Sequence, residues 1–130
     1  MASILVVDDD PDVRDLIAGI LRPVSHDVVT CANGVDAVAQ AEGREFDIAL
    51  IDIRMEPLDG VETTSRLRQL RPDLKVAMIT AFATHTSTHA DTIEKIVAAK
   101  SLGVTRFLTK PFHKDEVLGL VNRLLELNEA

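Results

Sequence analysis

Five short apolar runs alternate with longer amphipathic segments along this 130-residue chain, and the alternation restricts the fold more than any other feature. Each run is too short for a helix and is rich in β-branched residues, so we expect a strand. The expected strands are Ser3–Val7, Val28–Cys31, Phe46–Asp52, Lys75–Thr80 and Arg106–Thr109. Strands that alternate strictly with helices predict a parallel sheet that carries helices on both faces.

The segments between the runs carry helix start and stop signals. Asp10-Pro11 supplies an N-cap and a first-turn proline, and Asp59 stands three residues before Glu62, the spacing of a capping box. The expected helices cover about 11–22, 34–43, 60–70, 92–102 and 114–127. We therefore expect a single domain over residues 1–130, of the α/β class: a flavodoxin-like, doubly wound (βα)5 sandwich with the parallel sheet order 2-1-3-4-5.

Polar side chains end or directly follow four of the five runs. The acidic run Asp8–Asp10 follows the first, Asp52 and Thr80 are the last residues of the third and fourth, and Lys110 follows the fifth. In open α/β sheets, ligands bind outside the carboxyl ends of the strands. Each residue alone has an ordinary explanation, such as a helix cap, a turn residue or a surface charge. Together, carboxylates, a hydroxyl and an ammonium group at one edge predict a site for a divalent cation and a phosphoryl group.

Composition argues against several classes of function. The formal charge of −7 disfavours a nucleic-acid-binding surface, which needs clustered Lys and Arg. No run of about eighteen apolar residues is available to cross a bilayer, and no basic segment precedes the first strand as in a signal peptide. We expect a cytoplasmic domain that binds neither nucleic acid nor membrane directly.

Five short motifs occur in a fixed order: Val6–Pro11, Asp47–Asp52, Leu58–Gly60, Thr80-Ala81 and Lys110–Phe112. Each is weak evidence alone, whereas all five in order and on the expected elements are highly specific. Over essentially its full length, the chain resembles the receiver domain of two-component response regulators, the CheY-like superfamily. The resemblance implies a signalling domain that catalyses its own phosphorylation and dephosphorylation, not a turnover enzyme.

The resemblance also implies a magnesium site and a phosphoacceptor. By the family pattern, Asp9 and Asp52 bind Mg²⁺ directly, Asp8 binds it through water, and the backbone carbonyl of Arg54 completes the protein's share. Mg²⁺ prefers oxygen ligands and usually keeps several waters. Asp52 is the expected phosphoacceptor, in a Mg²⁺-dependent transfer from a sensor histidine kinase or a phosphotransfer protein.

A conformational switch is a further implication of the resemblance. The Thr80 hydroxyl and the Lys110 ammonium group would bond to the phosphoryl group on Asp52, and Phe107 would turn inward as Thr80 moves. The reshaped surface would comprise the fourth helix, the fifth strand and the fifth helix, where a downstream protein would bind. A homodimer linked to phosphorylation also fits this pattern.

Residues near the expected acceptor depart from the family pattern. Glu56 stands where the family commonly has proline, and Pro57 follows it, so we expect a modest change in loop shape. Arg54 and Phe82 occupy two variable positions that influence phosphate loss in receivers. Neither side chain positions a water well, and we therefore expect a comparatively long-lived phosphoryl state.

The segment from Thr80 to Lys110 is about eight residues longer than is usual, or roughly two helical turns, and the extra length falls in 83–90. His85 and His89 have the i, i+4 spacing that could bind a metal on a helix. The run is rich in Thr and Ser, which are poor helix formers, so an ordinary loop that helps to select a partner is the better interpretation.

Two other functions stay open from sequence. One is a receiver-like interaction module that works without phosphorylation; such a module typically lacks site residues that are all present here. The other is a phosphatase of the haloacid dehalogenase type, with Asp8 and Asp10 as its Asp-x-Asp pair. That scheme leaves Asp52 unexplained and has Asp12 where Thr is usual. The sequence also leaves open whether the chain is a stand-alone regulator or part of a longer protein.

Overall fold

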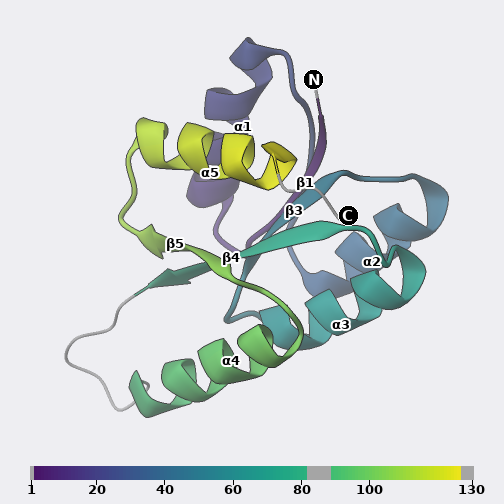
Figure 1. The fold of residues 1–130 in the computed structure, drawn as a ribbon, viewed down its shortest axis with the longest axis vertical. Coiled ribbons are helices and arrows are strands. Elements are labelled where there is room, and N and C mark those ends of the chain that lie inside the picture. Colours follow the sequence, from purple (N-terminus) through teal and green to yellow (C-terminus); the bar gives the residue numbers. More distant parts are fainter. Residues whose placement is uncertain (1, 82–88, 127–130) are drawn as a thin grey trace.

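The computed structural model describes residues 2–81 and 89–126. Five parallel strands form one sheet in the order β2-β1-β3-β4-β5 (Figure 1). The strands are β1 (Ser3–Val7), β2 (Asp27–Cys31), β3 (Ile48–Asp52), β4 (Lys75–Ala81) and β5 (Arg106–Lys110). The predicted fold class and sheet order are confirmed, and the largest error in a strand boundary is the start of β3, at Ile48 and not Phe46.

One helix follows each strand. The helices are α1 (Pro11–Leu21), α2 (Gly34–Gly43), α3 (Gly60–Leu70), α4 (His89–Ser101) and α5 (Lys114–Glu126), and a 3-10 turn, η1 (Arg22–Val24), follows α1. Asp10, Asn33 and Asp59 cap α1, α2 and α3, because each side chain accepts a hydrogen bond from a first-turn N–H. The predicted start of α4 was wrong, since the helix begins at His89. Within residues 2–81 and 89–126, no helix combines the length and apolar character that a membrane span requires.

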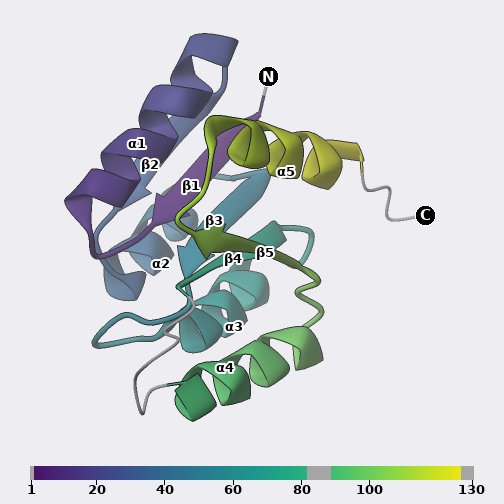
Figure 2. The ribbon, with the colours of Figure 1, turned by 90° about the vertical axis from the view of Figure 1, so that its left-hand side faces the viewer.

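The helices cover the sheet from both sides (Figures 1 and 2). On one face, α1 and α5 pack through residues such as Ile17 and Val121. On the other face, α2, α3 and α4 pack through Ala37, Leu67 and Ala99. The central strands β1 and β3 are buried on both faces, which explains why their sequences are continuous apolar runs without alternation.

The parallel register aligns the carboxyl ends of the strands. Asp52, the last residue of β3, is in register with Ile79 of β4, and Thr80 is in register with Thr109 of β5. Lys110 ends β5, next to Thr109. The polar residues that the sequence places after the apolar runs therefore lie at one edge of the sheet, together with the turn that follows β1.

Candidate functional site

Three aspartates converge at the carboxyl edge of the sheet. Asp8 and Asp9 follow β1, Asp52 ends the neighbouring β3, and one carboxylate oxygen of each lies within 4.8 Å of the others. Asp8 is fully buried and Asp52 is 6% exposed, whereas Asp9 is open to solvent. Buried carboxylates at this separation repel one another, so the cluster requires protons or cations to compensate its charge.

Lys110 brings one positive charge to this cluster from the end of β5. Its Nζ lies 3.1 Å from Oδ2 of Asp8 and 3.7 Å from Oδ2 of Asp52. Burial alone would lower the pKa of Lys110, but the charges of Asp52 and Asp8 outweigh that effect and raise it. Lys110 therefore stays protonated. A single ammonium group among three carboxylates leaves net negative charge, which suits a divalent cation.

The Asp52 carboxyl group ionises less readily than an ordinary aspartate. Burial, followed by the charge of Asp8, raises the pKa of Asp52 to about 7, although Lys110 acts in the opposite direction. Its Oδ1 accepts a hydrogen bond from the backbone N–H of Arg54 at 3.2 Å, and its Oδ2 faces Lys110. Strongly perturbed pKa values of this kind concentrate at functional sites.

Local contacts hold Asp8 inside and direct Asp10 outward. Oδ1 of Asp8 accepts a hydrogen bond from the N–H of Asp10 at 2.9 Å. The backbone carbonyl oxygen of Asp8 accepts one from Nη1 of Arg14 at 2.7 Å. The exposed Asp10 side chain caps α1 by accepting from the N–H of Asp12 at 2.9 Å. Asp10 therefore has the ordinary role of an acidic helix cap, which does not fit the phosphatase scheme that pairs it with Asp8.

The Thr80 hydroxyl lies buried at the same edge. Its Oγ1 has no hydrogen-bond partner in the part of the chain that the structure describes. Buried hydroxyl groups without a partner are rare in proteins, because losing water without a replacement costs free energy. An unsatisfied donor beside a cluster of hard oxygen ligands fits a site built for a divalent cation and a phosphoryl oxygen.

The loop from β3 to α3 is clamped against the strand end. The N–H of Gly60 donates to the carbonyl of Ile53 at 3.0 Å. A Cβ atom at Gly60 would lie 2.3 Å from the carbonyl oxygen of Asp52, so only glycine fits this approach. Asp59, just before it, caps α3 and also pairs with Lys95 of α4 at 2.7 Å.

Two other predicted site residues have roles that the structure does not test. Phe107 is partly buried on β5 and packs against the core on the side that α4 covers, with Nζ of Lys100 6.0 Å from its ring centroid. The Arg54 side chain is exposed, whereas its N–H holds Asp52. The predicted roles of Phe107 and of the Arg54 carbonyl stay predictions.

Predictions for the long segment after β4 also stay untested. Phe82 and His85 lie outside the described residues, as does the His89 side chain, so the interpretation of 83–88 as a loop and of His85 and His89 as a metal site is unchanged. For residues 89 and 90 the expected loop was wrong, because their backbone forms the start of α4.

Sequence reasoning missed the supporting roles of three residues near the site. Arg14 and Lys95 occupy ordinary helix positions 6 and 36 residues from the aspartates that they contact, and no local pattern marks either one. Gly60 was part of a recognised motif, but its close approach to Asp52 depends on the tertiary arrangement.

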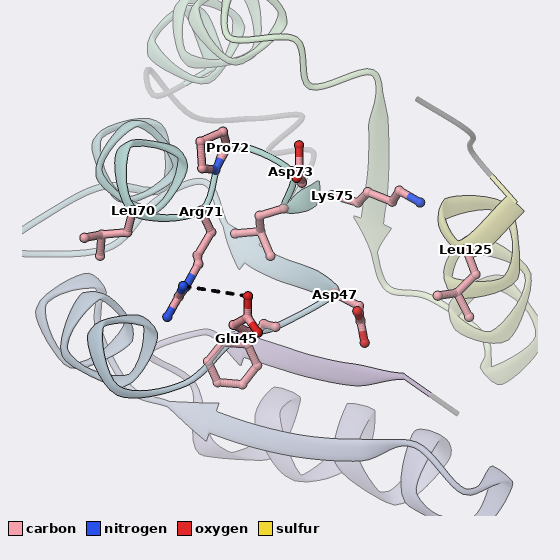
Figure 3. Close-up of a pocket in the computed structure, with 10 residues that line it drawn as sticks. Glu45, Asp47, Leu70, Arg71, Pro72, Asp73, Lys75 and Leu125 are labelled. Carbon is pink, nitrogen blue, oxygen red and sulfur yellow. Dashed lines mark ion pairs between the residues drawn. The ribbon is translucent and has the colours of Figure 1, made fainter. Parts of the chain in front are cut away.

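Two pockets lie at opposite ends of the sheet. A cavity of about 420 Å³ opens beside the carboxylates and is lined by Asp9, Arg54, Met55, Glu56, Asp59 and Lys95. A larger one, about 770 Å³, lies at the amino end, between the end of α3 and Leu125 of α5 (Figure 3). It contains the Arg71–Glu45 ion pair at 3.9 Å, and its acidic residues are exposed. The buried carboxylates Asp8 and Asp52, the raised pKa of Asp52 and the unpartnered Thr80 hydroxyl lie at the carboxyl end, which is therefore the candidate site.

Comparison with known proteins gives an independent line of evidence. A family model described as the response regulator receiver domain matches residues 4–122. The transcriptional regulatory protein TcrA of Mycobacterium tuberculosis is 35% identical over 121 residues, which cover 93% of this chain and 45% of TcrA. The transcriptional regulatory protein ZraR of Salmonella typhimurium is 31% identical over 95% of this chain and 26% of ZraR. The chain thus spans a quarter to a half of the length of these relatives.

Solved structures agree with these sequence matches. The receiver domain of NtrX from Brucella abortus is 33% identical, with a TM-score of 0.83 over 96% of this chain and 99% of that one. The chemotaxis protein CheY4 of Vibrio cholerae is 29% identical, with a TM-score of 0.81 over 95% of this chain and 98% of that one.

Proposed function

This chain belongs to the response regulator receiver family, and from that membership we propose that Asp52 accepts a phosphoryl group from a sensor histidine kinase or a phosphotransfer protein. Receiver domains are signalling domains and not turnover enzymes. The observation that carries the proposal is the buried Asp52 carboxyl group beside Asp8, with Nζ of Lys110 3.7 Å from Oδ2 of Asp52 and 3.1 Å from Oδ2 of Asp8. A cytoplasmic location is part of the same proposal and rests on the sequence.

In the proposed transfer, a carboxylate oxygen of Asp52 bonds to phosphorus as the P–N bond of a phosphohistidine breaks, which gives an acyl phosphate. Asp9, Asp52 and the Arg54 carbonyl would hold Mg²⁺, with Asp8 binding through water. When bound, the ion neutralises charge on the phosphoryl oxygens. Lys110 lies where its ammonium group would stabilise the same charge, and hydrolysis of the acyl phosphate would reset the domain.

The phosphoryl group would then act on Thr80 and Lys110. Phosphorylation adds roughly one unit of negative charge together with new acceptor oxygens. Hydrogen bonds that involve charged groups contribute about 1.5–3 kcal/mol each, so two amount to roughly 3–6 kcal/mol. Shifting a two-state equilibrium from 1:99 to 99:1 requires about 5.5 kcal/mol. The two contacts are thus large enough to change the surface formed by α4, β5 and α5, with Phe107 turning inward.

Partners and phosphate lifetime complete the proposal. The exposed Ile93 and Val97 of α4 give the proposed output surface an apolar strip for a downstream protein or a second phosphorylated copy. Arg54 and Phe82 would shield the acyl phosphate and make it comparatively long-lived. The decay of the phosphorylated form, followed by intact-protein mass after removal of the donor, checks the last point, and loss within seconds would contradict it.

The experiment that tests the function is phosphorylation with a small donor. Wild type, Asp52→Asn and Asp73→Asn are incubated with acetyl phosphate, with and without Mg²⁺, and intact mass is measured. Asp73 is an exposed aspartate at the opposite end of the sheet and serves as the matched control (Figure 3). We expect one Mg²⁺-dependent phosphoryl group on wild type and Asp73→Asn, and none on Asp52→Asn. A folded wild type that takes up no phosphate would instead favour the phosphorylation-independent interaction module.

A further inference from the structure

Over residues 93–101, helix α4 has less apolar packing against the domain than α5 has. Ala99 is buried there and Ile96 is partly buried against the core, whereas Ile93 and Val97 are exposed. The contrast with α5 is clear, because that helix buries four apolar residues: Val117, Leu120, Val121 and Leu124. Most of the free energy that fixes a helix comes from packing of its apolar face. Polar contacts therefore contribute a larger share to the position of α4.

One such contact is a shielded ion pair between α4 and the start of α3. Nζ of Lys95 lies 2.7 Å from Oδ2 of Asp59, and the two side chains are only 23% and 31% exposed. Burial tends to raise the pKa of Asp59, but the hydrogen bonds from Lys95 and from the N–H of Glu62 outweigh this effect and lower it. The carboxylate is thus held in its charged form. Its Oδ2 bonds to Lys95 of α4, and its Oδ1 accepts from the N–H of Glu62 in α3.

Asp59 is in turn rigidly connected to the candidate acceptor. The next residue, Gly60, donates its N–H to the carbonyl of Ile53 and lies so close to the Asp52 carbonyl oxygen that no Cβ would fit. A shift of the Asp59 backbone would therefore disturb the contacts that Gly60 makes with the end of β3. The chain of contacts runs from α4 through Lys95 and Asp59 to the residue that bears the nucleophile.

We propose that Lys95 is a positioning residue, whose ion pair with Asp59 couples the position of α4 to the Mg²⁺ affinity and phosphoryl acceptance of the Asp52 site. The proposal rests on the proposed function and adds to it the route by which that site communicates with the output surface. Coupling between two sites is reciprocal, so a partner that displaces α4 weakens Mg²⁺ binding, and occupancy of the site changes the mobility of α4.

Electrostatics alone predicts that loss of the Lys95 charge strengthens Mg²⁺ binding, whereas the proposal predicts that it weakens Mg²⁺ binding. This difference makes the proposal testable. Lys95 lines the same cavity as Asp9 and Glu56. Removing its positive charge makes this cavity more negative, and simple Coulomb attraction then strengthens binding of a divalent cation. Loss of positioning instead weakens binding, because the oxygen ligands around Asp52 are no longer held in place.

The test measures Mg²⁺ affinity by isothermal titration calorimetry on wild type, Lys95→Met, Asp59→Asn and the double variant. Lys114→Met, which removes an exposed lysine from α5, is the matched control. We expect Lys95→Met to weaken Mg²⁺ binding about fivefold, with Lys114→Met unchanged, and the double variant to be no weaker than Asp59→Asn alone. Hydrogen exchange of the α4 amides should be faster in Lys95→Met and should no longer respond to Mg²⁺.

Unchanged or tighter Mg²⁺ binding in Lys95→Met would overturn the coupling, as would additive effects in the double variant. Circular dichroism verifies folding, and Lys95→Gln replaces Lys95→Met if the latter does not fold. Phosphorylation of wild type separates this inference from the proposed function. If wild type accepts phosphate and Lys95→Met matches it in rate and in Mg²⁺ affinity, only the coupling fails. If wild type accepts none, the proposed function fails, while the Mg²⁺ titrations still decide whether Lys95 positions the site.

Discussion

The carboxyl and amino ends of the sheet both gather acidic and basic side chains, but they differ in how far those side chains are buried. At the carboxyl end, Asp8 is fully buried and Asp52 is 6% exposed, and one lysine faces both. At the amino end, the Glu45 side chain is 87% exposed and its ion pair with Arg71 spans 3.9 Å (Figure 3). The amino-end pocket is nevertheless the larger, at about 770 Å³ compared with 420 Å³.

Burial of charge, and not the number of charges or the size of a pocket, therefore distinguishes the candidate site from the opposite end of the sheet. An exposed ion pair costs little to form and little to lose. Two carboxylates taken out of water lower the stability of the fold unless a proton or a cation compensates them. Among the residues that the structure describes, the buried carboxylates lie at the carboxyl end, where a nucleophile and a cation site are proposed.

The largest expected effect is on stability as a function of pH. The pKa of Asp52 is raised to about 7 from 3.8, so between these values the folded state keeps a proton that the unfolded state has lost. The stability of wild type in metal-free buffer should therefore fall as pH rises from about 4 to 8. Asp52→Asn removes this titration and should be more stable than wild type by about 4 kcal/mol at pH 8, with little difference near pH 4.

Urea unfolding followed by circular dichroism measures this difference, since the chain has neither Trp nor Tyr to report by fluorescence. Asp73→Asn, at the exposed amino end, should follow wild type at every pH. Parallel curves for wild type and Asp52→Asn would show that the buried carboxylates do not destabilise the fold, and the contrast between the two ends would lose its energetic basis.

A smaller loss of stability is expected from adding one methyl group beside the acceptor. In Gly60→Ala the new Cβ would meet the Asp52 carbonyl oxygen at 2.3 Å and the Ile53 Cα at 2.7 Å, both of them backbone atoms. We expect a loss of about 2 kcal/mol in the free energy of unfolding, together with slower phosphoryl acceptance. Gly19→Ala is the matched control, because nothing lies within 4 Å of its added Cβ in α1.

In that control, alanine should stabilise the helix by about 0.5–1 kcal/mol. Urea unfolding measures both variants. If Gly60→Ala were as stable as wild type and accepted phosphate at the same rate, the end of β3 could not be as tightly clamped as the structure indicates.

Local sequence patterns predicted the sheet, because its determinants are local. The continuous apolar runs of β1 and β3 and the caps Asp10 and Asp59 each act within a few residues, and 2-1-3-4-5 is one of the common strand orders of doubly wound sheets. The pairing of Lys95 with Asp59 could not be predicted in this way, because it joins residues 36 apart whose positions depend on how two helices pack. The start of α4 was also misplaced, because the capping pattern at residue 91 predicts a later start than His89, where the helix begins.

The smallest expected effect concerns the amino end, where removing a charge should change stability very little. Glu45→Gln removes the acidic partner of Arg71 from a pair in which the glutamate is almost fully exposed. Because water screens such a pair, the free energy of unfolding should change by less than about 0.5 kcal/mol, and phosphoryl acceptance should not change. Arg71 also donates from Nη2 to the Ala41 carbonyl at 3.1 Å, and that contact stays in place. A loss of stability in Glu45→Gln as large as the effect at Asp52 would mean that exposure does not separate the two ends, and that the amino-end pocket needs a functional explanation of its own.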